Sequence, residues 1–119
     1  MNIEELQNYC LTKKGVEETF PFDEDTLVFK VLGKMFALMP LEKWELGQAS
    51  ISLKCDPEYS EELRANYSSI RGAYHMSKKH WNTLYLNEGE ISPQLLKELI
   101  DHSYELVVKG LPKKLRDML

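Results

Sequence analysis

The sequence has no long hydrophobic run, because no apolar stretch approaches the roughly 18 residues that a membrane-spanning helix needs. Its first residues, MNIEELQNYC, contain acids where a secretory signal peptide has a basic segment followed by an apolar one. These two absences argue against a membrane protein and against an exported one. We therefore expect a cytoplasmic protein without a membrane partner.

Cysteine is scarce as well. Cys10 and Cys55 are the two cysteines of the chain, and they do not form the CxxC spacing of redox or zinc sites. A chain with two cysteines and no export signal more often contains buried thiols than a disulfide framework. We therefore expect both cysteines to be small, reduced core residues.

The motifs of common enzyme classes are missing. The sequence contains no Gly-rich phosphate loop and no nucleophile elbow. His75 and His80 are five positions apart, not four as in the paired histidines of a metalloprotease helix. Nothing in the sequence brings Cys55 and His75 together as a nucleophile and its base. We therefore expect a non-enzymatic protein with no catalytic residues, no metal site and no cofactor.

The charge is unevenly distributed along the chain. The net charge of −4 argues against a protein that coats itself with nucleic acid. Residues 1–29 contain seven acids and two lysines, whereas residues 67–86 contain three cations and no acid. The acidic blocks coincide with predicted helices, and the basic blocks with predicted strands, their turns and the C-terminal tail. A folded molecule with this order can have two electrostatically different sides.

Length and composition predict a single domain over residues 1–119. Apolar residues recur at helical spacing over residues 2–13, which predicts a first helix. TLVFKVLGKMFALMP indicates a hairpin of two strands that turns near Gly33 and closes at Pro40. ASISLKC alternates apolar and polar residues, as is typical of a strand with one solvated face.

The second half of the chain predicts two helices and two further strands. Asp56 and Ser92 are capping residues, and each precedes a proline suited to the first turn of a helix. Between these helices, residues 74–76 and 81–86 are predicted as short strands joined by a turn at residues 77–79. The order α-β(3)-α-β(2)-α predicts an α+β two-layer sandwich, with an antiparallel sheet and helices on one of its faces.

The last predicted strand leaves a question about the uncovered sheet face. Side chains alternate across a strand, so Leu84 and Leu86 point one way while Trp81 and Tyr85 point the other. If the leucines face the core, the two rings stand on the open face near basic residues. Stacking rings with positive charge are typical of nucleic-acid sites. The alternative is that Trp81 belongs to the core or to a cross-strand pair.

The stretch GAYHMSKKHWNTLYL, together with KVLGKMFAL, ISLKCDPE and SYELVVKGLPKKLRD, resembles the MmcQ/YjbR family of small bacterial proteins. The resemblance covers nearly the whole chain and implies the same α-β(3)-α-β(2)-α arrangement, like that of secretion chaperones. Family members often carry Pro-Gly before the Tyr-His pair. This chain has Arg71, Gly72 and Ala73 there, so we expect the turn before that pair to differ.

The resemblance also implies DNA binding, a description of the family that rests on two β-ribbon wings. Phosphate contacts supply most nonspecific affinity, so weak, salt-dependent binding is expected from a chain of this net charge. The alternative is a module that binds a protein, a peptide or a small ligand on the open sheet face. No oligomeric state is predicted. The candidate nucleic-acid-binding residues are Lys34, Lys54, Arg71, His75, Lys78, Lys79, His80 and Trp81.

Overall fold

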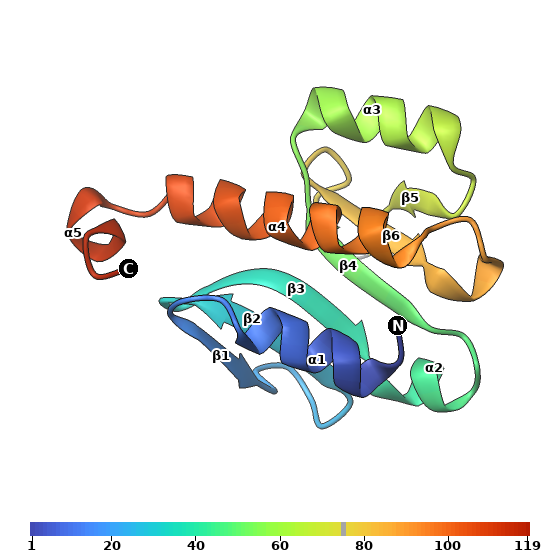
Figure 1. The fold of residues 1–119 in the computed structure, drawn as a ribbon, viewed down its shortest axis with the longest axis horizontal. Coiled ribbons are helices and arrows are strands. Elements are labelled where there is room, and N and C mark those ends of the chain that lie inside the picture. Colours follow the sequence, from blue (N-terminus) through green and yellow to red (C-terminus); the bar gives the residue numbers. More distant parts are fainter. Residues whose placement is uncertain (75) are drawn as a thin grey trace.

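Six antiparallel strands form one layer of the molecule, and helices cover one face of this sheet (Figure 1). The computed structural model describes residues 1–74 and 76–119. The strand order is β1-β2-β3-β4-β6-β5, so β6 lies between β4 and β5. The strands are β1 (Val16–Thr19), β2 (Thr26–Val31), β3 (Lys34–Pro40), β4 (Ser50–Lys54), β5 (Ile70–Gly72) and β6 (Trp81–Tyr85). The helices are α1 (Ile3–Leu11), α2 (Leu41–Glu45), α3 (Pro57–Asn66), the 3₁₀ turn η1 (Leu86–Glu88), α4 (Pro93–Lys109) and α5 (Lys113–Arg116).

Three helices begin at capping side chains, two of which, Asp56 and Ser92, are expected from the sequence. The Asn2 side chain accepts the Glu5 N–H at 2.8 Å at the start of α1. Asp56 accepts two backbone N–H groups at the start of α3, and Ser92 accepts one at the start of α4. These side chains satisfy N–H groups that have no partner within the helix, which explains why local sequence located these boundaries well.

The β2–β3 hairpin turns at Leu32 and Gly33, as predicted. Both residues have positive φ, 46° for Leu32 and 87° for Gly33. A two-residue hairpin turn with this backbone matches the twist of the flanking strands. Glycine adopts it without strain, whereas Leu32 adopts a region that side chains disfavour.

The core lies between the sheet and the helices α1, α3 and α4. Cys10 and Cys55 are buried in it and are not bonded to each other, in agreement with their prediction as core residues. The largest fully buried side chains include Leu6, Phe29, Phe36, Met39, Ile51, Leu84 and Ile100. The α+β two-layer class with an antiparallel sheet and helices on one face is confirmed.

The prediction of a strand at residues 74–76 is wrong. The strand before β6 is β5, whose Ile70 and Gly72 pair with Leu84 and Asn82. Tyr74 and Met76 lie in the loop that follows, and His75 falls outside the described residues. The loop ends where the Trp81 N–H donates to the Ser77 carbonyl oxygen at 2.9 Å.

Four short elements were not predicted from the sequence: β1, α2, η1 and α5. The last strand was predicted to end at residue 86, but it ends at Tyr85 because Leu86 begins η1. Among the described residues, no helix has both the length and the apolar character that crossing a bilayer requires.

Candidate binding groove on the open sheet face

The sheet face away from the helices, called the open face below, carries every second side chain of β6. Leu84 is buried against the helices, whereas Trp81, Thr83 and Tyr85 are half-buried on the open face. This division agrees with the strand alternation expected from the sequence. Trp81 is therefore not part of the helix-side core.

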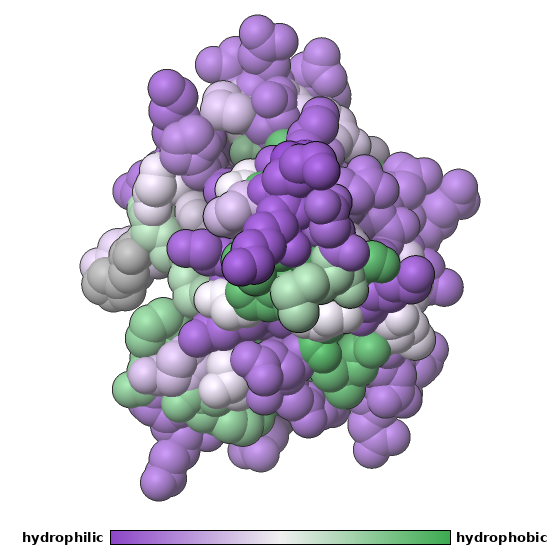
Figure 2. Space-filling view, turned by 90° about the vertical axis from the view of Figure 1, so that its left-hand side faces the viewer, coloured by the Kyte–Doolittle hydropathy of each residue, from purple (hydrophilic) through white to green (hydrophobic). Residues whose placement is uncertain are grey.

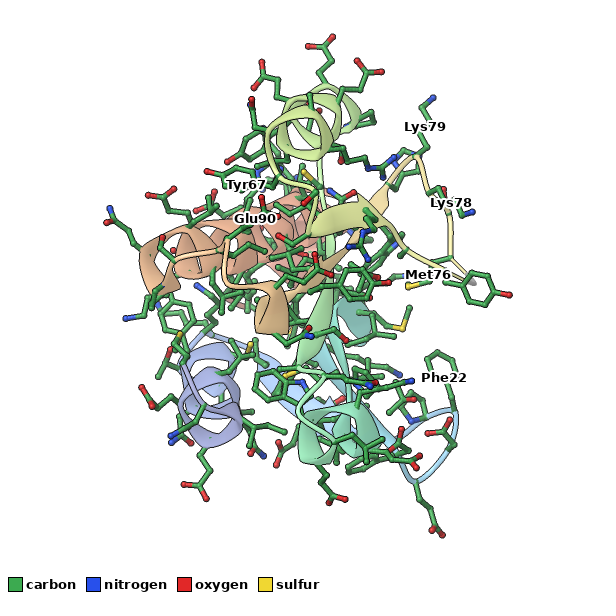
Figure 3. The ribbon with its side chains drawn as sticks, turned by 90° about the vertical axis from the view of Figure 1, so that its right-hand side faces the viewer. Phe22, Tyr67, Met76, Lys78, Lys79 and Glu90 are labelled. Carbon is green, nitrogen blue, oxygen red and sulfur yellow. The ribbon has the colours of Figure 1, made fainter. Side chains whose placement is uncertain are left out.

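A groove of about 920 Å³ runs over the open face. Two loops from opposite ends of the strand order border this groove. Phe22 projects from the β1–β2 loop and Met76 from the β5–β6 loop (Figure 3). Hydrophobic residues gather on the left-hand margin of Figure 2, where the open face is seen from its edge. The apolar and aromatic residues that line the groove are Phe22, Met35, Leu38, Pro40, Tyr74, Met76, Trp81 and Tyr85.

The floor of the groove contains a strip of hydroxyl groups from β4 and β6. Ser52 Oγ and Thr83 Oγ1 are 2.9 Å apart and share a hydrogen bond. Ser50 is two residues before Ser52 in β4, so it is on the same face and also lines the groove. The groove therefore combines apolar walls, which suit flat rings, with hydrogen-bonding groups between them.

Three of the predicted cations lie near Trp81, although none of them lines the groove, whose charged lining residues are Lys43 and Glu88. Lys54 is directly opposite Trp81 in the β4–β6 pair. Lys78 and Lys79 are exposed on the loop before β6 and point away from the sheet (Figure 3). His80 is also exposed there, and its carbonyl oxygen accepts the Cys55 N–H at 2.8 Å.

Two other predicted cations are placed differently. Arg71 forms hydrogen bonds of 2.7 and 2.9 Å to the two carboxylate oxygens of Glu88, and its guanidinium lies 4.4 Å from the centre of the Tyr85 ring. Its charge is thus compensated within the protein. Lys34 is exposed next to the hairpin turn and does not line the groove, whereas its neighbour Met35 does. His75, the remaining predicted residue, falls outside the described residues.

Arg64 on α3 holds the loop that carries Lys78, and sequence reasoning missed it. Its Nε donates to Asn82 Oδ1 at 2.7 Å, and its Nη2 donates to the carbonyl oxygens of Lys78 and Trp81. Asn82 is 1% exposed and donates to Ser60 Oγ at 3.0 Å. An asparagine on the core-facing side of a strand is the signal that could have revealed this network, because buried polar groups need partners.

Phe22 and Tyr74 are two exposed aromatic residues of the groove that sequence reasoning did not select. Their side chains are 63% and 73% exposed, which is high for aromatic residues. The pattern FPFDED, an aromatic pair beside three acids, is the local feature that could have drawn attention to Phe22. Exposed aromatics at the mouth of a groove are typical of binding sites.

The described residues contain no cluster suited to a metal ion, and both cysteine thiols are buried. No group of three or more His, Cys, Asp or Glu side chains in this part of the chain could hold a metal ion. Burial raises the pKa of the Cys10 thiol to about 12 and raises the pKa of Cys55 above its ordinary value. Both thiols are therefore protonated at neutral pH and are poor nucleophiles.

Comparison with known proteins places the chain in a family. The YjbR family model matches residues 11–106. The chain is 35% identical to "Uncharacterized protein YjbR" of Escherichia coli K12, over 100% of this chain and 98% of that protein. It is 44% identical to "Uncharacterized protein YbdF" of Escherichia coli O157:H7, over 93% of this chain and 88% of that protein.

Two solved structures share the fold. The crystal structure of Deinococcus radiodurans protein DR2400, with domain DUF419, has a TM-score of 0.87 and 41% identity, and the match covers 98% of this chain and 86% of that one. A crystal structure of a Pseudomonas syringae protein has a TM-score of 0.72 and 30% identity, covering 89% and 98% of the two chains. The family match, the identities and the shared fold agree with the resemblance seen in the sequence: the chain belongs to the YjbR family.

Proposed function

We propose that this protein is a non-enzymatic binding protein whose open face binds single-stranded nucleic acid. One observation carries the proposal: Lys54 is directly opposite Trp81 in the β4–β6 pair, so a cation and a stacking ring are neighbours on one surface. Unpaired bases would stack on the rings of Trp81 and its groove neighbours, and phosphates would contact Lys54, Lys78 and Lys79. Proteins that bind single strands combine these two kinds of contact.

Single strands fit this surface better than a duplex does. A duplex keeps its bases stacked inside and offers mainly phosphates, whose binding scales with the number of cations that reach them. Arg71 is already paired with Glu88, so Lys54, Lys78 and Lys79 are the predicted cations that remain near Trp81. Three phosphate contacts give weak duplex binding, whereas stacking adds about 1–3 kcal/mol for each base.

The proposal is tested with a fluorescent oligo(dT) strand and a labelled duplex, titrated across a salt series. Single-strand binding is expected to exceed duplex binding. Replacing Lys78 and Lys79 together by Ala is expected to lower the slope of log K against log salt by about 1.4 for single strands. Trp81→Ala is expected to remove about 1–3 kcal/mol of strand binding.

The matched control is Lys109→Ala, which removes an exposed cation from α4 on the other side of the sheet. It should leave the salt slope unchanged. Thermal melts of all variants separate lost binding from lost stability, because Trp81 is half-buried. Absence of strand binding at low salt, or an unchanged slope in the double lysine variant, would rule out nucleic acid as the ligand of this face.

A second candidate is a small apolar or aromatic ligand in the same groove. It is supported by the apolar wall that Met35, Leu38 and Pro40 form. The stacking of bases on the rings of β6 does not require this wall. Pockets for small ligands combine such walls with a few polar groups. This candidate replaces the first if single-stranded nucleic acid does not bind, an apolar fluorophore does bind, and Leu38→Gln abolishes the binding of the fluorophore. Either ligand is consistent with a cytoplasmic location, where buried thiols such as Cys10 remain reduced.

A further inference from the structure

A second groove lies on the helix side of the molecule, at the edge formed by α1, β1 and α2. These three elements frame the lower part of Figure 1. The groove has a volume of about 550 Å³. We call it the α1–α2 groove. Its apolar residues are Ile3, Phe20, Leu27, Leu41 and Trp44.

The apolar residues of the α1–α2 groove are buried at its base and exposed at its mouth. Leu27 is 3% exposed and belongs to the core, whereas Phe20 is 47% exposed. Trp44 Nε1 donates to the Ser50 carbonyl oxygen at 2.9 Å, which fixes the orientation of its ring. The groove thus presents a preformed apolar surface that none of the described residues covers.

The charged residues that line this groove have one sign. Glu18 and Glu45 line it, and no Lys, Arg or His does. The hydrogen bond that Glu18 accepts from Gln7 comes from a neutral amide, so this bond brings no positive charge to the groove. Glu4 and Glu5 are exposed on α1, and Glu42 is exposed on α2.

We propose that the α1–α2 groove binds a basic peptide segment of a partner protein, with one bulky apolar residue inserted beside Phe20 and Trp44. Lysine or arginine residues flanking that anchor would meet the carboxylates of Glu18 and Glu45. The anchor would supply most of the affinity, because a buried bulky side chain dominates small interfaces. The acidic rim would supply on-rate and specificity, since charge complementarity steers encounter.

The acidic rim also decides between possible occupants. Nucleic acid and anionic membrane surfaces carry negative charge and would be repelled. A second copy that used the same surface would bring two acidic faces together, because Glu18 and Glu45 line the groove and the nearby Glu4, Glu5 and Glu42 are exposed. A partner with a basic, apolar-anchored segment is the occupant whose charge matches. This site is independent of the nucleic-acid surface proposed above.

Phe20 and Phe22 provide a matched pair of variants. They are two positions apart and both exposed, but Phe20 lines the α1–α2 groove and Phe22 lines the groove of the open face. Removing either ring is expected to cost little stability, because substitutions at exposed positions usually have small effects. Each variant is therefore the control for the other.

The probe is a synthetic fluorescent peptide with one tryptophan flanked by lysines and arginines. It is compared with a peptide in which the tryptophan is Gly and with one in which the basic residues are Glu. Anisotropy at low salt should show binding of the first peptide, and amide chemical-shift changes should lie in α1, β1 and α2. Phe20→Ala should weaken binding at least tenfold and Glu45→Gln severalfold, while Phe22→Ala should leave it unchanged.

Four results would overturn the proposal: no binding of the basic peptide, equal binding of the acidic one, insensitivity to Phe20→Ala, or shift changes on the open face. These outcomes do not depend on whether the open face binds nucleic acid. Phe22→Ala should weaken strand binding and leave peptide binding intact if both proposals hold. Failure of one site is thus distinguishable from failure of the other.

Discussion

The hydroxyl of Ser103 donates a 2.6 Å hydrogen bond to the carbonyl oxygen of Phe36, and both side chains are fully buried. The same hydroxyl oxygen accepts the backbone N–H of Lys54 at 2.9 Å. One side chain of α4 therefore joins β3 to β4. The register of β2 and β3 shifts near Phe36, as in a β-bulge, and the backbone groups freed there need partners from outside the ladder.

The first prediction follows from this contact. Ser103→Ala would leave a carbonyl and an N–H group without a partner in the protein, so the free energy of unfolding should fall by about 1–3 kcal/mol. Urea denaturation measures this change. Ser77→Ala, at an exposed position, should change stability by about 0.5 kcal/mol or less. Equal effects in the two variants would show that the Ser103 hydrogen bonds do not add to the free energy of unfolding.

How far the fold was predictable depends on how local its causes are. The starts of α3 and α4 were predicted because Asp56 and Ser92 act on their own neighbours. β5 was misplaced because its position depends on pairing with β6, across the loop that begins at Ala73. β1 was missed because VEET has acids in place of strand-forming apolar residues, and pairing with β2 overrides that preference.

The second prediction concerns Arg64, which positions the loop that carries Lys78. Arg64→Ala removes the donors to Asn82, Lys78 and Trp81, and Arg64→Lys cannot replace the fork of a guanidinium. Both variants should speed hydrogen exchange at the amide of Trp81. Removing a matched guanidinium, Arg116→Ala on α5, should leave that exchange unchanged. Unaltered exchange in Arg64→Ala would show that other contacts hold the loop.

The third prediction concerns stability at alkaline pH. The ordinary pKa of a cysteine is 9.0, and burial raises the pKa of Cys10 to about 12. The folded protein therefore keeps a proton that the unfolded chain loses above pH 9. The stability linked to this group is fully present below pH 9 and is lost as pH rises toward 12.

The urea midpoint of the wild type should accordingly fall as pH rises through this window. Tyr9 contributes in the same direction, because burial and a 2.6 Å hydrogen bond to Asp101 raise its pKa to about 12. Cys10→Ala lowers stability at every pH by opening a cavity, but its pH dependence should be shallower than that of the wild type. Parallel curves for the two proteins would contradict the buried, protonated thiol.

The binding groove was less predictable than the fold. Strand alternation is a local rule and is enough to put Trp81 on the face opposite Leu84, whereas the pairing of Trp81 with Lys54 is seen only in the structure. Phe22 and Met76 line the same groove from loops that lie more than fifty positions apart, so only the sheet order brings them together. Arg71 was selected for its charge, and no local pattern indicates that Glu88 compensates it.

The last prediction uses this Arg71–Glu88 pair to test whether the open face contacts phosphates. Glu88→Gln keeps the size of the side chain but removes the carboxylate that holds the guanidinium, leaving Arg71 stacked near Tyr85 with its charge uncompensated. The exposed pair contributes about 0–1 kcal/mol to folding, so the variant should remain folded. If single strands bind as proposed, its affinity for oligo(dT) should rise, and the salt slope should steepen by about 0.7, the value of one added phosphate contact.

The control for that variant is Glu105→Gln, which makes the same change in net charge at an exposed position of α4. It should leave the slope unchanged, because one distant charge adds no phosphate contact and is screened beyond roughly 10 Å at 0.1 M salt. Equal gains in both variants would mean that overall charge, not Arg71, sets the affinity. An unchanged slope in Glu88→Gln would place Arg71 outside the path of the strand and limit the phosphate contacts to the three lysines near Trp81.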